Sequence, residues 1–198
     1  MYDSTASTLR DGHRSAADTS RAGLSTWHRV YLSLGSNVEP ERHLQAALLR
    51  LRERFRLVQV SNTWRTAPIH CADQPCYLNL AAAMDTRAEP EELYRQLKLL
   101  EQDVGRCKHS RSEPCEIDVD ILFYDDLVAD FGRLRLPHRS IPHCAYVLAP
   151  LAELAPDLVH PTEGRTIAQL LARIDPAQRQ GVEDIGPLPR EAVDDALR

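Results

Sequence analysis

Several features that assign a protein to a class are missing from this 198-residue sequence. No apolar run approaches the length of a membrane-spanning helix, and residues 1–28 lack the apolar stretch of a secretory signal. The formal net charge of −5 argues against the basic surface that general nucleic-acid binding needs. We therefore expect a cytoplasmic monomer whose partners are small molecules, with neither a nucleic acid nor a membrane among them.

The cysteines also lack a recognisable pattern. Their number is five, which is odd, and their spacing matches no zinc signature. In a chain that is not exported, these side chains are expected to be reduced thiols rather than disulfides. They are Cys71, Cys76, Cys107, Cys115 and Cys144.

The length and the ordinary composition, with 43% hydrophobic and 27% charged residues, predict one globular domain. Residues 1–28 are rich in small polar and charged residues without apolar periodicity, and are expected to be a disordered arm. Residues 29–174 should form the folded domain. Residues 175–198 are acidic and contain three prolines, so we expect a peripheral tail.

The periodicity of apolar residues predicts the order of the elements. Residues 30–34, 57–64, 77–86 and 116–124 have the composition of strands. Helices are predicted from Pro40, from Pro90 and over 145–155. The first six elements follow the order β-α-β-β-α-β. Two split βαβ units of this kind predict an α+β, ferredoxin-like sandwich with an antiparallel sheet, helices on one face and an additional C-terminal helix.

The strand over 116–124 contains the most informative pattern. Asp118 and Asp120 are two residues apart, so in an extended strand both side chains project from one face. Like charges held side by side repel unless a cation lies between them. Mg²⁺ commonly takes one or two carboxylates and leaves its other positions to water and phosphate oxygens. The pair therefore indicates phosphoryl chemistry on a nucleotide, with a surface strand that has an acidic face as the alternative.

Three other segments contain candidate binding residues. The loop 105–114 is rich in Arg, Lys and His and suits a polyphosphate, although a solvated loop at a helix C-terminus would look the same. Tyr77 and Asn79 share a strand face and suit a flat, hydrogen-bonding heterocycle, while Asn79 could equally cap a neighbouring loop. His138 follows a proline and could contact phosphate, carry a proton or simply lie on the surface.

Together these segments resemble the 6-hydroxymethyl-7,8-dihydropterin pyrophosphokinase family of folate biosynthesis. The resemblance covers residues 30–161 and rests on the order and spacing of several short motifs. These are Tyr31-Leu-Ser-Leu-Gly-Ser-Asn37, Arg65-Thr-Ala-Pro68, Asp73-Gln-Pro-Cys-Tyr-Leu-Asn79, Pro90-Glu-Glu-Leu93, Glu101 with Gly105-Arg106, Pro114 through Asp120, Pro137-His138 and Tyr146 through Pro161.

The resemblance implies a ferredoxin-like fold and the transfer of diphosphate from ATP to the pterin hydroxymethyl group, with release of AMP. It implies that Asp118 and Asp120 hold two Mg²⁺ ions that bridge the ATP phosphates, and that these aspartates act in catalysis with Arg106 and His138. The residues that it implies at the pterin are Thr66, Ile69, Tyr77, Asn79 and Tyr146. Those that it implies at the nucleotide are Glu101, Arg106, Lys108, Arg133 and His138.

The sequence departs from the family pattern where the family has phosphate-facing arginines. The stretch Arg111-Ser-Glu-Pro-Cys115 stands where the family usually has Arg-Trp-Gly-Pro-Arg, Cys144 stands where another arginine is expected, and His70 replaces a glycine. Lost positive charge weakens transition-state binding. The alternatives are therefore an active enzyme, a catalytically weak paralogue that binds a pterin or nucleotide or acts on a different pterin, and a metal- or redox-sensing protein that uses Cys115 and Cys144.

Overall fold

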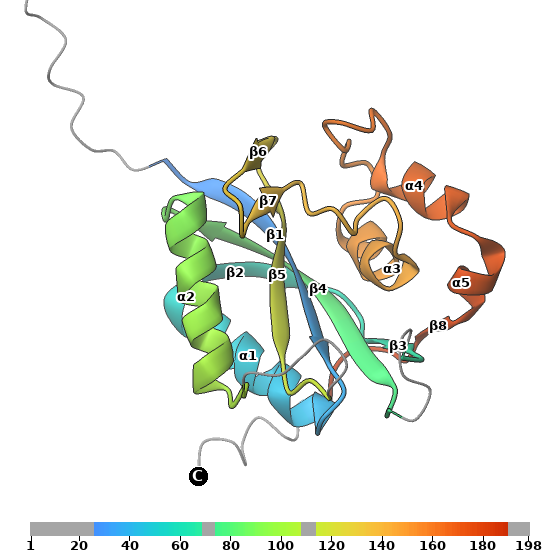
Figure 1. The fold of residues 1–198 in the computed structure, drawn as a ribbon, viewed down its shortest axis with the longest axis horizontal. Coiled ribbons are helices and arrows are strands. Elements are labelled where there is room, and N and C mark those ends of the chain that lie inside the picture. Colours follow the sequence, from blue (N-terminus) through green and yellow to red (C-terminus); the bar gives the residue numbers. More distant parts are fainter. Residues whose placement is uncertain (1–25, 69–73, 108–113, 190–198) are drawn as a thin grey trace, which may run out of the picture.

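The computed structural model describes residues 26–68, 74–107 and 114–189. Its centre is a six-stranded antiparallel sheet of order β5-β1-β4-β3-β8, in which β2 and β3 pair with successive parts of β4 (Figure 1). In chain order the elements are β1 (His28–Ser36), α1 (Pro40–Arg54), β2 (Arg56–Val60), β3 (Trp64–Thr66), β4 (Tyr77–Thr86), α2 (Pro90–Asp103), β5 (Asp118–Tyr124), β6 (Ala129–Asp130), β7 (Arg135–Leu136), α3 (Ala145–Leu154), α4 (Ile167–Arg173), α5 (Pro176–Gln180) and β8 (Val182–Asp184).

The strand order β5-β1-β4-β2 is that of two interleaved split βαβ units. The predicted α+β, ferredoxin-like fold is therefore confirmed. The single strand expected over 57–64 is instead two strands, β2 and β3, with a break between them. At this break the Ser61 hydroxyl accepts a hydrogen bond from the backbone N–H of Ala81 at 2.9 Å, so a side chain takes over part of the strand pairing.

The helices α1 and α2 form because each has a proline at its start and a leucine stripe along one face. The buried leucines are Leu44, Leu48 and Leu51 of α1 and Leu93, Leu97 and Leu100 of α2. They pack against Leu32 and Leu34 of β1 and against Val119 and Ile121 of β5. Each such leucine contributes roughly 2 kcal/mol by leaving water, so this face holds the larger core.

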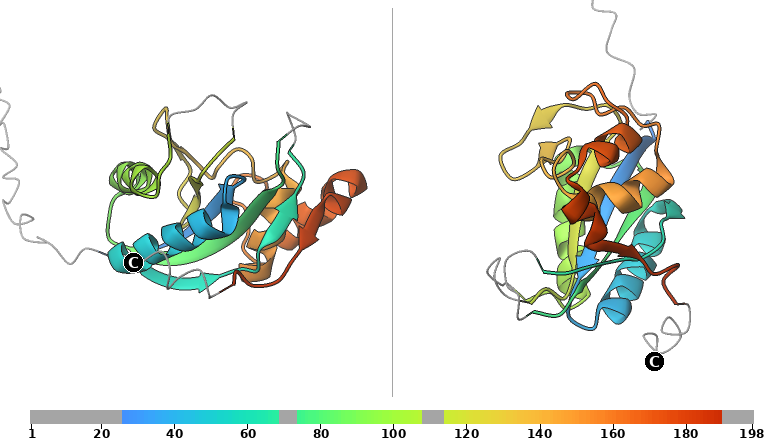
Figure 2. Two further views of the ribbon diagram at one scale, coloured as in Figure 1. Left: turned by 90° about the horizontal axis from the view of Figure 1, so that it is seen from below. Right: turned by 90° about the vertical axis from the view of Figure 1, so that its right-hand side faces the viewer.

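The opposite face of the sheet is covered in part by α3 and α4 (Figures 1 and 2). There Phe123 and Ala81 pack with Leu148 and Leu151 of α3 and with Ile167 of α4. The expectation that the helices cover one face was therefore incomplete, because Ala81 of β4 with Leu122 and Phe123 of β5 gives this side of the sheet a buried apolar patch as well. Since α3 covers only part of the face, the rest remains open.

The segment after Ile174 is less peripheral than expected. Residues Val182–Asp184 form β8, which pairs with β3 and extends the sheet. Farther on, the buried Gln45 side chain of α1 donates a hydrogen bond to the Pro189 carbonyl. The sequence does not predict this pairing because β8 has only three residues, too few for a recognisable strand pattern.

Candidate active site

A cavity of about 840 Å³ lies on the part of the sheet face that α3 leaves uncovered. The register of the paired strands determines which residues form the floor of this cavity. Gly35 of β1 lies opposite Asn79 of β4 on one side and opposite Asp118 of β5 on the other, and Ser33 lies opposite Asp120. Neighbouring strands are about 4.8 Å apart, so Asn79 and Asp118 flank a span of about 10 Å with only a glycine between them.

The predicted alternation on β5 is realised. Val119 and Ile121 are buried, whereas the Asp118 and Asp120 side chains remain 43% and 36% exposed and line the cavity. Burial and the neighbouring Asp118 charge raise the pKa of Asp120, against the lowering effect of Lys98, His138 and Arg106. Two carboxylates that repel each other in this way favour a bound cation.

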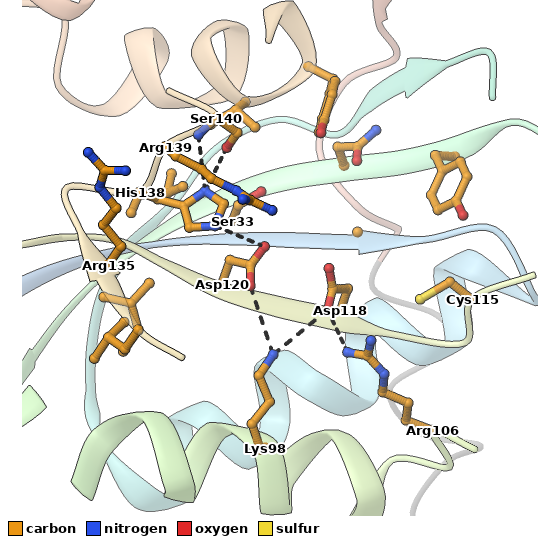
Figure 3. A pocket seen from close by; sticks show the side chains of 18 of the residues that line it. Ser33, Lys98, Arg106, Cys115, Asp118, Asp120, Arg135, His138, Arg139 and Ser140 are labelled. Atoms are coloured by element: carbon orange, nitrogen blue, oxygen red, sulfur yellow. Dashed lines mark hydrogen bonds and ion pairs between the residues drawn. The ribbon is translucent and has the colours of Figure 1, made fainter. Parts of the chain in front are cut away.

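Two cationic side chains from the α2 side contact the carboxylates (Figure 3). Arg106 donates to Asp118 Oδ1 at 2.5 Å, and the Lys98 ammonium lies 3.8 Å from Asp118 Oδ1 and 3.9 Å from Asp120 Oδ1. Both cations also bind Glu101, Lys98 at 2.6 Å and Arg106 at 2.7 Å. The result is an alternating network of acidic and basic groups along the β5 edge.

Glu101 anchors this network from below and does not line the cavity. Its side chain is 3% exposed and also accepts the backbone N–H of Val119 at 2.7 Å. Burial raises the pKa of Glu101, while Lys98, the Val119 N–H and Arg106 counteract that effect. Its location therefore indicates a positioning role for Lys98 and Arg106, and direct nucleotide contact by Glu101 stays a prediction.

At the other end of the floor, Asn79 is held by Thr66. The buried amide nitrogen of Asn79 donates to Thr66 Oγ1 at 2.9 Å and lies 3.5 Å from the Trp64 carbonyl oxygen. The amide oxygen is thus the end of the side chain that is directed to the cavity floor. The rings of Tyr77 and Tyr146 line the same cavity, so the residues suit a flat ring with hydrogen-bonding edges.

Position 35 needs a glycine because the Asn79 amide lies close to the backbone there. A Cβ atom at position 35 would lie 3.0 Å from Oδ1 of Asn79, closer than ordinary van der Waals contact. We expect Gly35→Ala to displace the amide and to lower the affinity for the pterin that the sequence resemblance implies about tenfold, a cost within the range of small-to-large substitutions. Titration of 6-hydroxymethylpterin by fluorescence measures this, with ATP affinity as the internal control. Equal weakening of both ligands would contradict a local effect.

The chain segment between β7 and α3 forms another wall of the cavity. His138 is held by a hydrogen bond from its backbone N–H to the Leu122 carbonyl at 2.9 Å and by contact of Nδ1 with Ser140 Oγ at 2.7 Å. Its Nε2 lies 3.9 Å from Asp120 Oδ2. Arg139 of this segment also lines the cavity, as does Arg133, which precedes β7, so both add positive charge to the cavity wall.

Asn37 connects the segments on either side of the floor. Its side chain is buried, accepts the backbone N–H of Cys115 at 2.6 Å and donates to Gln74 Oε1 at 3.0 Å. The Asn37 backbone N–H also donates to the Cys115 carbonyl at 2.9 Å. The segments that lead into β4 and β5 are therefore both hydrogen-bonded to Asn37, which directly follows β1.

Most of the predicted site residues come together in the cavity. Those in its lining are Thr66, Tyr77, Asn79, Arg106, Asp118, Asp120, Arg133, His138 and Tyr146. Ile69 and Lys108 lie outside the described residues. Sequence reasoning missed Ser33, Gly35 and Lys98. Lys98 could have been noticed because it is three residues before Glu101 on a helix, whereas Ser33 and Gly35 are revealed only by strand pairing.

The donor set fits Mg²⁺ better than a softer metal. Within the described ranges, no group of three or more His, Cys, Asp or Glu side chains could hold a metal ion. Two hard carboxylate oxygens therefore face the cavity without the fuller protein cage that zinc requires. This arrangement leaves most ligand positions to water and phosphate, as is usual for nucleotide-bound Mg²⁺.

A carboxylate pair surrounded by cations and adjoining a polar pocket for a flat ring is the arrangement of a phosphotransferase with a small heterocyclic substrate. The family model described as "7,8-dihydro-6-hydroxymethylpterin-pyrophosphokinase (HPPK)" matches residues 31–156. The chain belongs to this family. The predicted class, an ATP-dependent pterin diphosphokinase, is thereby confirmed.

Individual relatives agree with the family match. The chain is 44% identical over 148 residues to a 2-amino-4-hydroxy-6-hydroxymethyldihydropteridine pyrophosphokinase of Pseudomonas aeruginosa, covering 73% of this chain and 90% of the relative. A protein of the same name from Methylorubrum extorquens is 39% identical over 158 residues, covering 78% and 99%. The folic acid synthesis protein fol1 of Schizosaccharomyces pombe is 37% identical, and the chain spans 21% of its length.

Solved structures support the fold. A Plasmodium falciparum HPPK-DHPS crystal structure with pteroate superposes with a TM-score of 0.64 at 14% identity over 80% of this chain. The chain spans less than half of that protein, 47%. At this identity the likeness concerns the fold alone, and it agrees with the strand order described above.

Proposed function

We propose that this chain transfers diphosphate from ATP to the hydroxymethyl group of 6-hydroxymethyl-7,8-dihydropterin, releasing AMP, as a step of folate biosynthesis. The single observation that carries the proposal is the row Asn79–Gly35–Asp118, one residue on each of three adjacent strands. The row supports the proposal because Asn79, which suits a hydrogen-bonding ring, lies two strands from Asp118, which suits metal and phosphate. Gly35 lies between them and has no side chain, so it leaves room for the two substrates to approach each other.

In the proposed reaction the pterin hydroxyl oxygen bonds to the β-phosphorus of ATP. The bond between that phosphorus and the oxygen bridging to the α-phosphate breaks, the bridging oxygen leaves with AMP, and the hydroxyl proton is released. Asp118 is the carboxylate nearer to the pterin pocket, because it shares the Gly35 register with Asn79, and is placed to accept this proton. Thr66 and Asn79 orient the ring so that the hydroxyl faces the carboxylates.

Asp118 and Asp120 would hold Mg²⁺, two ions in our proposal, and the bound metal would neutralise charge on the phosphates. Arg106, Arg133 and His138 would contact the nucleotide from two walls of the cavity. The guanidinium of Arg106 is oriented by Glu101 and Asp118, which leaves its remaining N–H groups for phosphate oxygens.

We also propose that the protein acts as a cytoplasmic monomer. Across the part of the chain that the structure describes, no helix is both long and apolar enough to cross a membrane. The described residues that the proposed reaction uses line a single cavity of the chain, which supports this proposal.

The alternative of a catalytically weak binder is favoured by Cys115 and Cys144, which stand at positions expected to be arginine. AMP release with ATP, Mg²⁺ and 6-hydroxymethyl-7,8-dihydropterin separates the two functions. We expect turnover that requires both substrates. Tight binding of both ligands without AMP release would establish the binder instead.

The redox alternative receives less support from the environment of Cys115. Burial, with Asp118 nearby, raises the pKa of the Cys115 thiol to about 11. The reactive thiolate is therefore scarce at neutral pH, and oxidation at this position should be slow. Cys115 is better explained as a neutral side chain in the cavity wall.

Cys115→Arg tests whether the cavity still follows the family arrangement. We expect the affinity for ATP to rise or stay unchanged, because the new guanidinium would restore a forked phosphate donor beside the carboxylate pair. Isothermal titration with a non-hydrolysable ATP analogue and Mg²⁺ measures it, with Cys107→Arg, on an exposed position, as the matched control. A markedly lower affinity in Cys115→Arg alone would show that this part of the wall has a different path.

A further inference from the structure

Lys98 is a charged side chain in the cavity that none of the sequence motifs includes. It reaches from α2 toward β5, where its ammonium donates to Glu101 Oε1 at 2.6 Å and to the Val119 carbonyl oxygen at 3.1 Å. An ammonium has three N–H donors. With two engaged on the helix and strand, the third is directed to the aspartates, at 3.8 Å from Asp118 and 3.9 Å from Asp120 (Figure 3).

Three carboxylates surround the Lys98 ammonium and favour its charged form, Glu101 at 2.6 Å, Asp118 at 3.8 Å and Asp120 at 3.9 Å. The hydrogen bonds to Glu101 and to the Val119 carbonyl hold the nitrogen in place. The separations of 3.8 and 3.9 Å are too long for hydrogen bonds, so the third N–H is not committed to either aspartate.

We infer that Lys98 is a fixed cation of the diphosphate site, which balances the aspartate pair when the site is empty and donates its third N–H to a phosphate oxygen of the bound nucleotide. This inference rests on the proposed function, because it assigns the phosphates to the Asp118–Asp120 end of the cavity. Lys98 thereby supplies positive charge that Cys115 and Cys144 do not. Glu101 holds the Lys98 ammonium in this position, which explains why a carboxylate is buried beneath the cavity.

A fixed cation beside two metal-binding carboxylates has a second consequence. It repels a divalent cation that arrives alone, but it attracts the phosphates that accompany the cation in a metal–nucleotide complex. Removal of the Lys98 charge should therefore have opposite effects on the two ligands. The metal alone should bind more tightly and the nucleotide more weakly, a pair of shifts that a loss of structure would not produce.

The test compares Lys98→Gln with the wild-type protein by two measurements. Mn²⁺ alone serves as the metal probe, titrated by electron paramagnetic resonance without nucleotide, and a non-hydrolysable ATP analogue with Mg²⁺ is titrated calorimetrically. We expect Mn²⁺ to bind about threefold more tightly or better. We expect analogue affinity to fall between about tenfold and a hundredfold, the usual range for a lost charge-assisted hydrogen bond.

Two variants control for charge. Lys98→Arg keeps the cation and should retain most of the analogue affinity. Arg95→Gln removes a cation from the same helix, where Arg95 is exposed and pairs with Glu92 outside the cavity. It should shift neither measurement. If Arg95→Gln reproduced the effects of Lys98→Gln, they would come from net charge, and the inference would be overturned.

Lys98→Gln also removes one partner of the buried Glu101, and the variant could lose stability for that reason. The double variant Lys98→Gln/Glu101→Gln removes both charges, and thermal unfolding verifies that it is folded. It should show the same loss of analogue affinity. Wild-type-like analogue affinity in either folded variant, or weaker Mn²⁺ binding in Lys98→Gln, overturns the inference. AMP release by the wild-type protein is measured separately, so absence of turnover would reject the proposed function while these binding shifts still decide the role of Lys98.

Discussion

Replacement of Asp120 by Asn is expected to slow AMP release about a thousandfold or more while the protein stays folded. The loss is of the size seen when one preorganised electrostatic group of an active site is removed. Asn keeps the shape of the side chain but lacks the charge that would hold Mg²⁺. Steady-state AMP release at saturating substrates measures the effect, and Asp118→Asn should give a comparable loss.

The same variant makes a prediction about stability with a definite sign. The pKa of Asp120 is raised in the folded protein by burial and by Asp118. A raised carboxyl pKa favours folding at low pH, and that contribution is lost as the pH rises through the folded pKa. At neutral pH and without metal, the charged Asp120 side chain therefore lowers the stability of the folded protein. We expect Asp120→Asn to unfold at the same or a higher temperature than the wild-type protein.

Asp126→Asn is the matched control, since Asp126 is exposed just beyond β5 and does not line the cavity. It should change neither AMP release nor the unfolding temperature appreciably. Full activity of Asp120→Asn at ordinary Mg²⁺ would contradict the metal assignment. A large fall in its unfolding temperature would show instead that the aspartate has a structural task.

The second large effect is expected at the other end of the cavity floor. Asn79→Ala should weaken pterin binding about a hundredfold, because the ring would lose a buried hydrogen-bond partner and its own polar groups would be left unpaired. ATP affinity should change less than about twofold, since Asn79 is separated from the carboxylates by Gly35. Calorimetric titration of each ligand alone gives both values.

A control for this variant is Asn62→Ala. The Asn62 side chain donates to Asp184 outside the cavity, at 3.1 Å. Its replacement removes an amide of the same size without touching the floor, so pterin affinity should be retained. Equal losses of pterin and ATP affinity in Asn79→Ala would assign the residue a structural role, through its hydrogen bond to Thr66.

The features that could be predicted from sequence are those that depend on neighbours in the chain. The leucine stripes of α1 and α2 repeat at helical spacing, and the alternation on β5 places Asp118 and Asp120 on one face whatever lies beside them. The order and spacing of several short motifs were sufficient to indicate the family. These patterns are local because side-chain direction is set by the backbone conformation of a few residues.

The composition of the cavity floor was decided by tertiary structure. Gly35 lies between Asn79 and Asp118 only because β1 pairs with β4 on one side and with β5 on the other, across separations of about 40 and 80 residues. No local pattern indicates that register, and a shift of one residue would turn the aspartates into the core. The place of Lys98 likewise depends on how α2 packs against β5.

The second layer of helices and β8 belong with the features that only the three-dimensional structure reveals. α3 is apolar on much of its surface, so its sequence predicts burial but not which face of the sheet it covers. β8 is too short for a strand pattern and exists because β3 offers it an unpaired edge. The sequence by itself determined the main helices and strands of the ferredoxin-like core and the chemistry of the carboxylate pair. Only the packing of distant strands and helices decided what surrounds that pair, because those contacts depend on the total free energy of the folded chain and not on any single segment.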